Sequence, residues 1–257
     1  MNRFFLSWDK PACRAVAERL LSLENDFHRH LVLVPTRESG RQLREYLASI
    51  SRTQAIFAPQ VIPADQFLRM EEKEETASAP EELAGWLLAL GDSPHRLYPR
   101  LFPRAMPEDF SSMLEMAGSL QNLRHAMANQ GISCIMAHHA CAGRDERWTD
   151  MERLEEQCTQ QLESWKLENR TRSEEQAKPP PRLLNSLRET GGNIILACAA
   201  EVPAPLRHAL RHAESNGVPV QIWIHAPEEE AASFDSWGCP LPEEWSRRPI
   251  KIRDDQI

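Results

Sequence analysis

The feature that most narrows the possible folds of this chain is the segment Leu31–Leu47, which reads LVLVPTRESGRQLREYL. Its first part is a near-continuous apolar run, typical of strands that are covered on both faces of a parallel sheet. Pro35 and Thr36 then indicate a sharp turn. An amphipathic helix follows, with one apolar face made by Leu43, Tyr46, Leu47 and Ile50. A buried strand that leads directly into such a helix indicates an α/β fold.

Other segments repeat this alternation. Apolar runs predict further strands at Arg3–Ser7, Asn193–Ala199 and Val218–His225. A fifth, weaker strand is predicted at Ala55–Ile62, where Pro59 removes a donor from the ladder. Strands that alternate with helices through short connections form βαβ units, so we expect a parallel sheet of four or five strands.

Two helices of this domain have recognisable ends. Asp9 is expected to cap the first, with Pro11 in its opening turn. The apolar side of this helix is predicted to comprise Cys13, Val16, Ala17, Leu20 and Leu21. A later helix begins at Pro203 and ends before Gly217, a natural left-handed residue after a helix.

Between about residues 80 and 187 the apolar period becomes helical throughout. One long helix is predicted from its apolar repeat at Phe110, Met113, Leu114, Ala117, Leu120, Leu123 and Met127. Polar segments at 71–80 and 168–181 bracket this region, and their composition predicts solvated linkers. We therefore expect a discontinuous α/β domain at 1–75 and 191–232, a helical insertion at 76–190 and a C-terminal segment at 233–257.

Composition and charge exclude several classes of protein. The net charge of −8 argues against a surface that is basic throughout and coats nucleic acid, although a local basic stripe is compatible with it. The six cysteines form no CxxC pair, and the chain shows neither a signal peptide nor a stretch of membrane-span length. These features predict a soluble, cytoplasmic protein without a membrane partner.

Three clusters of polar residues are interpreted as structural. Adjacent histidines in a helix point in different directions, so His138 and His139, near Cys134 and Cys141, predict no metal site. The acidic runs at 71–72 and 228–230 are typical of solvated faces. Charge pairing along one helix accounts for Asp150, Glu152, Arg153, Glu155 and Glu156. We expect no catalytic residue, no metal and no cofactor.

The C-terminal segment around Trp237 is rich in aromatic residues, in a chain with seven tryptophans and two tyrosines. Phe234, Trp237 and Trp245 lie in a segment without helical period. Such side chains can stack on the bases of single-stranded nucleic acid. Scattered aromatic residues are poor evidence of a stacking platform, so we favour the interpretation that they hold an irregular segment on the α/β core.

A second candidate site follows the strand at Leu31–Pro35. Thr36, Arg37, Arg41 and Arg44 come after the carboxyl end of a central strand, the edge at which open parallel sheets bind ligands. A threonine hydroxyl and a helix N-terminus at this edge can bind a phosphate. Alternatively, Thr36 only caps its helix. Both interpretations remain open.

The first turn occupies the position in which a nucleotide-binding fold places its phosphate loop. It runs Ser7-Trp8-Asp9-Lys10-Pro11-Ala12 and contains no glycine and no Lys-Ser/Thr pair. Backbone N–H groups must close around the phosphates, and a hydroxyl must reach magnesium. Pro11 also removes a backbone donor. We therefore expect Ser7, Trp8, Asp9 and Lys10 to form a degenerate phosphate loop that binds no nucleotide.

The order of these segments resembles the N-terminal half of AddB/RexB-type proteins, which are UvrD-helicase-like, PD-(D/E)XK-nuclease-bearing proteins of bacterial double-strand-break repair. RFFLSWDKPACRAVAERLL is similar to their first strand and phosphate-loop region. LVLVPTRESGRQLREYL is similar to the next segment, which in active helicases of this type touches the DNA backbone. The later segments that resemble this family are APQVIPADQFLRM, RWTDMERLEEQCTQQLESWKL, NIILACAAEVPAPLRHALRHAESNGVPVQIWIHAP and FDSWGCPLPEEW.

This resemblance implies a helicase-like fold without ATP chemistry. Where active relatives hold magnesium with an acidic pair, this chain reads Leu196-Ala197-Cys198-Ala199-Ala200, and Glu201 lies past the strand end. The nuclease of the family lies further downstream, and its motif is absent here, so we expect a piece of a longer protein.

The resemblance also implies a function: a non-catalytic domain of a recombination nuclease. Such a domain would bind DNA weakly through its phosphates, or would act as a scaffold for a helicase–nuclease partner subunit. Two alternatives remain. One is a Rossmann-like domain of an enzyme that binds a nucleotide or a phosphorylated metabolite, and the other is a protein-interaction module.

Overall fold

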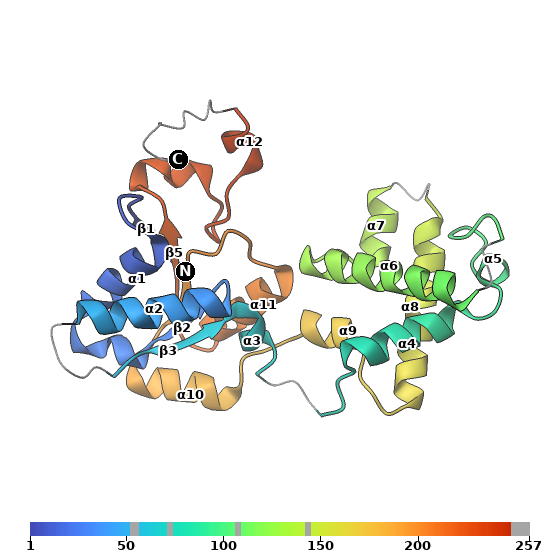
Figure 1. The fold of residues 1–257 in the computed structure, drawn as a ribbon, viewed down its shortest axis with the longest axis horizontal. Coiled ribbons are helices and arrows are strands. Elements are labelled where there is room, and N and C mark those ends of the chain that lie inside the picture. Colours follow the sequence, from blue (N-terminus) through green and yellow to red (C-terminus); the bar gives the residue numbers. More distant parts are fainter. Residues whose placement is uncertain (52–56, 71–73, 106–108, 142–144, 248–257) are drawn as a thin grey trace. The chain divides into compact units, whose positions relative to one another are not determined.

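The computed structural model describes residues 1–51, 57–70, 74–105, 109–141 and 145–247 (Figure 1). The chain forms two compact units. Unit 1 comprises Met1–Met70, Pro179–Val202 and Leu210–Ile257, and unit 2 comprises Glu71–Lys178 and Pro203–Ala209. The helix α10 (Pro181–Thr190), which the sequence placed with the helical insertion, belongs to unit 1.

Unit 1 contains a five-stranded sheet in which every strand is parallel to its neighbours. The strand order is β1-β5-β4-β2-β3. The register aligns Leu33 with Leu196, and Leu196 with Ile222. The predicted α/β class and parallel sheet are confirmed. The strands are β1 (Asn2–Leu6), β2 (Leu31–Val34), β3 (Gln60–Pro63), β4 (Ile194–Ala197) and β5 (Val220–His225).

The fifth strand exists but starts later than predicted. β3 lies at one edge of the sheet and begins directly after Pro59, which has no N–H to donate to a ladder. Of the strand predicted at Ala55–Ile62, residues 55–56 lie outside the described residues.

Helices α1 (Ala12–Leu21) and α2 (Arg37–Ile50) cover one face of the sheet. Their buried side chains pack with strand residues of that face, including Val32, Val34, Ile195 and Trp223. Leu33 and Leu196 point to the opposite face, because side chains alternate along a strand. In Figure 1, α10 lies across the sheet from α2.

The remaining elements of unit 1 are η1 (Glu24–Arg29), α3 (Ala64–Leu68), η2 (Glu228–Ser233) and α12 (Pro242–Trp245). The residues of α11 (Ala204–Ser215) are divided between the two units.

The expected cap of the first helix is wrong. The N-cap residue of α1 is Pro11, whose ψ of 141° is extended, and no side chain caps the helix. Asp9 therefore stands two residues before the N-cap residue and does not cap the helix. The predicted apolar side of this helix is confirmed for Val16, Ala17 and Leu20, which are buried.

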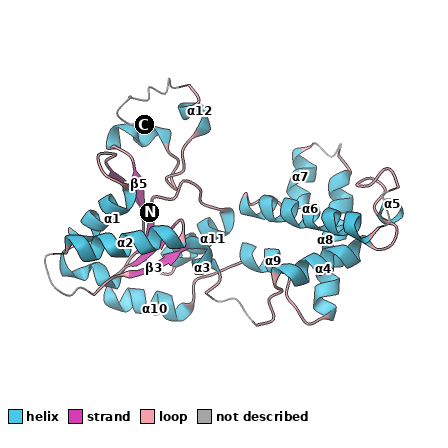
Figure 2. Cartoon of the chain, in the orientation of Figure 1, coloured by secondary structure: helices cyan, strands magenta, loops and turns pink. Residues whose placement is uncertain are grey.

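Unit 2 is helical, and Figure 2 shows no strand in its described part. Its core contains Trp86, Leu120, Met151, Leu154 and Leu162. The predicted apolar repeat near 110–127 is only partly buried. Ala117, Leu120 and Met127 lie in the core, whereas Phe110, Leu114 and Leu123 are exposed. The helices are α4 (Ala79–Leu90), α5 (Pro94–Leu97), α6 (Phe110–Asn129), α7 (Cys134–Ala140), α8 (Arg147–Ser164) and α9 (Arg170–Glu175).

The segment 168–181 was expected to be a solvated linker, and this is wrong for its first half. Asn169 and Thr171 are buried, and α9 begins between them. Glu168 pairs with Thr76 in a short parallel bridge. These polar side chains can be buried because they have partners: the hydroxyl of Thr171 donates to Glu82 at 2.8 Å, and Asn169 donates to Thr159 at 3.1 Å.

The aromatic residues of the C-terminal segment pack on unit 1, as we favoured from the sequence. Trp237 is only 2% exposed, so its ring is closed to a stacking base. Trp245 lies against Trp8 and Phe234, with ring centroids 6.3 and 5.8 Å apart. Arg3 donates to the backbone carbonyls of Ala231, Phe234 and Asp235 and thereby holds the same segment against β1.

None of the helices in the described ranges is both long enough and apolar enough to cross a bilayer.

Candidate functional site at the carboxyl edge of the sheet

A small cavity lies where strands β2 and β4 end, at the edge where parallel sheets bind ligands. Its volume is about 90 Å³. Helices α1 and α2 and the ends of the two strands supply its walls, which are almost entirely apolar. The lining residues are Ala12, Cys13, Val16, Val34, Pro35, Ser39, Leu43, Ala197 and Cys198. The start of α1 and the end of β4 thus meet at one cavity.

Hydrogen bonds connect the first turn, Ser7–Ala12, to the end of β5. The indole N–H of Trp8 donates to the carbonyl of His225 at 2.6 Å, and His225 Nε2 donates to the carbonyl of Lys10 at 2.9 Å. The side chain of Lys10 lies 2.6 Å from the carboxylate of Glu18. Hydrogen bonds from Lys10 and Arg14 lower the pKa of that carboxyl group. The lysine of this turn is therefore engaged within the protein.

The end of β4 carries Cys198 in a left-handed backbone conformation with φ of 53°. Its N–H donates to the carbonyl of Trp223 at 2.8 Å. Burial, together with the nearby thiol of Cys13, raises the pKa of Cys198 to about 12. Glu201 is exposed and does not line the cavity. The cavity wall therefore presents two protonated thiols and no carboxylate at neutral pH.

The second candidate site uses most of its polar groups internally. The hydroxyl of Thr36 accepts from the N–H of Ser39 at 3.0 Å, so Thr36 caps α2. Arg41 pairs with Glu38 and Glu45 on the same helix. Arg44 donates to the carbonyl of Val61 at 3.3 Å.

Arg37 differs from these two arginines. It is exposed and makes no ion pair with any residue that the structure describes. Of the three arginines among the predicted phosphate contacts, Arg37 is therefore the one whose charge is not engaged by the described residues of this surface.

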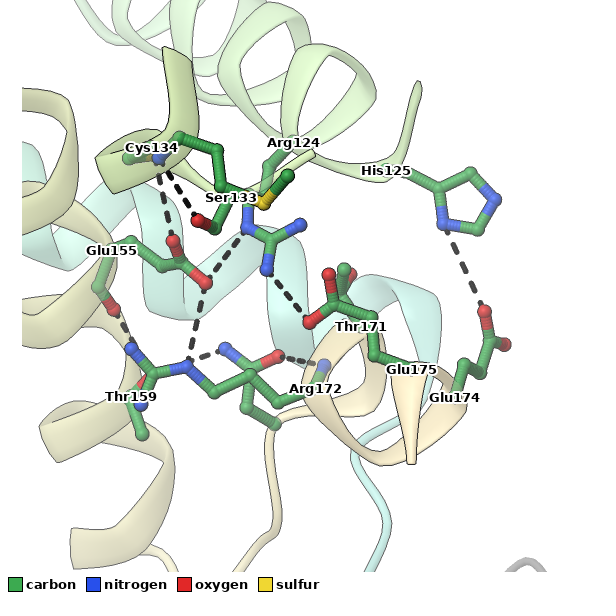
Figure 3. Close-up of polar contacts among 12 residues, drawn as sticks. Arg124, His125, Ser133, Cys134, Glu155, Thr159, Thr171, Arg172, Glu174 and Glu175 are labelled. Atoms are coloured by element: carbon green, nitrogen blue, oxygen red, sulfur yellow. Dashed lines mark hydrogen bonds and ion pairs between the residues drawn. The ribbon is translucent and has the colours of Figure 1, made fainter. Parts of the chain in front are cut away.

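Unit 2 contains a buried ion network that was not predicted from the sequence (Figure 3). Arg124, on α6, is 4% exposed. Its Nε lies 2.8 Å from Glu155 on α8, and its Nη2 lies 2.8 Å from Glu175 on α9. Glu155 also contacts Arg172 at 3.4 Å and accepts from the thiol of Cys134 at 3.7 Å. The network ties three helices together. Its only sequence signal is an arginine on an otherwise apolar helix face.

The acidic residues of α8 therefore do more than pair along one helix. Arg153 does contact Asp150 at 3.5 Å, as expected. However, Asp150 is buried and accepts from the backbone N–H groups of Arg100 and Leu101, at 2.8 and 3.3 Å. Glu155 pairs with arginines of other helices. These roles depend on tertiary contacts that helix periodicity does not predict.

The two cysteines of the histidine and cysteine cluster differ in burial, whereas the rings of His138 and His139 lie edge to face with their centroids 5.9 Å apart. Cys134 is buried, and burial beside Glu155 raises its pKa to about 12. Cys141 is exposed, and His138 contacts the carbonyl of Asp145 at 3.3 Å. In the described ranges, no three residues of the His, Cys, Asp and Glu types are grouped as metal ligands would be.

No protein-family model and no curated protein matches this chain.

Proposed function

We propose that this chain is a non-catalytic, degenerate helicase-like domain of a cytoplasmic, bacterial double-strand-break repair nuclease of the AddB/RexB type, which engages DNA or acts as a scaffold. The observation that carries this proposal is the apolar cavity at the carboxyl edge of the sheet. The two segments that the resemblance assigns to phosphate and to magnesium both line it, but with Cys13 and Cys198 in place of phosphate-binding and acidic groups.

The lining of this cavity favours the helicase-like domain over a nucleotide-binding enzyme. A triphosphate carries several negative charges, and transfer of charge into an apolar site without compensating donors costs free energy. Lys10 is the nearest cation of the first turn, and its ammonium group already pairs with Glu18. A Rossmann-like enzyme would in addition need a glycine-bearing first turn, which this sequence lacks.

The scaffolding role is favoured by the apolar surface of unit 2. Leu88, Leu97 and Phe110 are 54%, 48% and 69% exposed. A groove of about 650 Å³ is lined by residues that include Leu87, Leu88, Phe110 and Met113. Exposed apolar side chains beside such a groove suit a site of protein interaction, as a helicase–nuclease partner subunit would require.

The DNA-engaging role is tested by fluorescence anisotropy with labelled single-stranded and duplex oligonucleotides across a salt series. We expect weak binding, equal for unrelated sequences, with a linear fall of log K against log salt. The triple variant Arg37→Ala, Arg41→Ala and Arg44→Ala should lower the slope by about one unit for each lost phosphate contact. Because Arg41 and Arg44 are engaged within the protein, Arg37→Ala alone should account for most of that change. Absence of binding at low salt would leave only the scaffolding role.

A further inference from the structure

Unit 2 carries an arginine segment, residues 93–105. It reads SPHRLYPRLFPRA and contains three arginines and no acidic residue, in a chain whose net charge is −8. Arg96, Arg100 and Arg104 recur at every fourth position and are all exposed. A local concentration of positive charge on an acidic protein is the electrostatic signature of a site for a polyanion.

The backbone of this segment directs the arginines outward. Tyr98 N–H donates to the carbonyl of Pro94 at 2.8 Å, and Phe102 N–H donates to the carbonyl of Tyr98 at 2.9 Å. In such turns, residues four apart share a side and residues two apart lie on opposite sides. Tyr98 and Phe102 are buried, at 3% and 7% exposure. The arginines, offset from them by two positions, therefore face solvent.

The segment is held firmly by unit 2. The hydroxyl of Tyr98 donates to the carbonyl of Ala89 at 3.0 Å. The buried carboxylate of Asp150 accepts from the N–H groups of Arg100 and Leu101, at 2.8 and 3.3 Å. A ligand that binds the arginines would thus meet a fixed backbone, and less conformational entropy would be lost on binding.

The side chains of the three arginines are available to bind a ligand. Arg96 and Arg104 make no ion pair with any of the residues described. Arg100 pairs with Glu146 at 2.7 Å, but both side chains are more than half exposed. An exposed pair of this kind is weak and is easily exchanged for a phosphate, with which arginine forms two parallel hydrogen bonds.

We propose that the arginine segment is a second nucleic-acid contact, in which Arg96, Arg100 and Arg104 bind backbone phosphates. This inference rests on the proposed DNA-engaging function and adds a binding surface in unit 2. Contacts to phosphate carry no sequence information, so this surface binds single-stranded and duplex DNA without sequence preference. An acidic segment of a partner protein is the competing ligand.

The test compares the salt dependence of DNA binding between the wild-type chain and the variant Arg96→Ala, Arg100→Ala and Arg104→Ala. We expect the log–log slope to fall by about two to three units, because about 0.7 to 0.9 units are lost for each phosphate contact. The matched Arg→Lys triple variant should retain most of the slope, since it retains the charges. Arg147→Ala is the control and should leave the slope unchanged, because Arg147 donates from Nε and Nη2 to both carboxylate oxygens of Asp145, whereas Arg100 makes a single contact with Glu146.

The outcomes separate this inference from the function on which it rests. If the wild-type chain binds DNA and the alanine triple variant keeps its slope, the arginine segment is not a DNA surface, and the proposed function stands. If the lysine variant loses as much as the alanine variant, the effect is structural and the inference fails. If the wild-type chain binds no DNA at low salt, this inference and the DNA-engaging role are both overturned, the scaffolding role remains, and the acidic partner is favoured.

Discussion

The ammonium group of Lys10 lies 2.6 Å from the carboxylate of Glu18, and this pair engages the lysine that stands in the phosphate-loop position. Both side chains are partly exposed, so the pair contributes little to stability. The pair matters because it engages the ammonium group of Lys10 within the protein. The first turn keeps a lysine but directs it to α1, while the cavity beside that helix is lined by apolar and thiol groups.

Gly192 is predicted to be the least replaceable glycine of unit 1. A Cβ atom added there would lie 2.1 Å from the backbone oxygen of Arg29. We expect Gly192→Ala to reduce the free energy of unfolding by about 2–3 kcal/mol, because backbone must move to relieve the overlap. Gly118→Ala is the matched control. Gly118 lies inside α6, and a Cβ atom added there would meet only Leu83, at 3.9 Å. This variant should gain about 0.5–1 kcal/mol of stability, because alanine is the better helix former. Urea denaturation of both variants measures the difference, and equal midpoints would contradict the prediction.

Arg124 is predicted to hold unit 2 together. Arg124→Met leaves the carboxylate of Glu155 buried without its closest cation, which should cost about 3–5 kcal/mol. The double variant Arg124→Met, Glu155→Leu should recover most of that loss, because it removes both charges. Arg147→Ala, at an exposed pair, should leave stability nearly unchanged. Thermal and chemical unfolding of the three variants would refute a structural role for the network if Arg124→Met behaved like Arg147→Ala.

The half-buried thiol of Cys198, at the end of β4, predicts a loss of stability in alkali. Its pKa is about 12 in the folded chain and about 8.5 in an unfolded one. The Cys198 thiol therefore stays protonated to a higher pH in the folded state than in the unfolded state. The stabilisation is complete below about pH 8.5 and disappears as the pH rises toward 12. Cys198→Ala should lose less stability than the wild-type chain between pH 7 and pH 10. Parallel pH dependence in the two proteins would contradict this prediction.

The sequence predicted the centre of the sheet well, because β2 and β4 are short apolar runs that are buried on both faces. Leu31–Val34 and Ile194–Ala197 are buried at every position, so their composition alone indicates their environment. The cap at Asp9 was wrong because Pro11 takes an extended conformation, and the start of the helix moves to Ala12. Thr36 was assigned two roles, and the capping role is confirmed by the position of Ser39.

The buried polar side chains of unit 2 were not predicted from the sequence, because their burial depends on partners from other helices. Arg124 and Glu175 are far apart in the sequence, and the segment around Thr171 has the composition of a solvated linker. Only the packing of α6, α8 and α9 brings the opposite charges together. The arginine segment was missed for a related reason. Its outward direction depends on the burial of Tyr98 and Phe102, which periodicity over so short a segment does not establish.

Calorimetric titration of the chain with magnesium-ATP tests the central claim most directly, namely that this is a nucleotide-handling architecture without nucleotide chemistry. The titration should be repeated on Glu18→Gln, which frees Lys10 from its partner. We predict no saturable heat from either protein, because the cavity offers no phosphate cradle and no carboxylate for magnesium. A one-to-one isotherm with micromolar affinity for the wild-type chain would contradict the account.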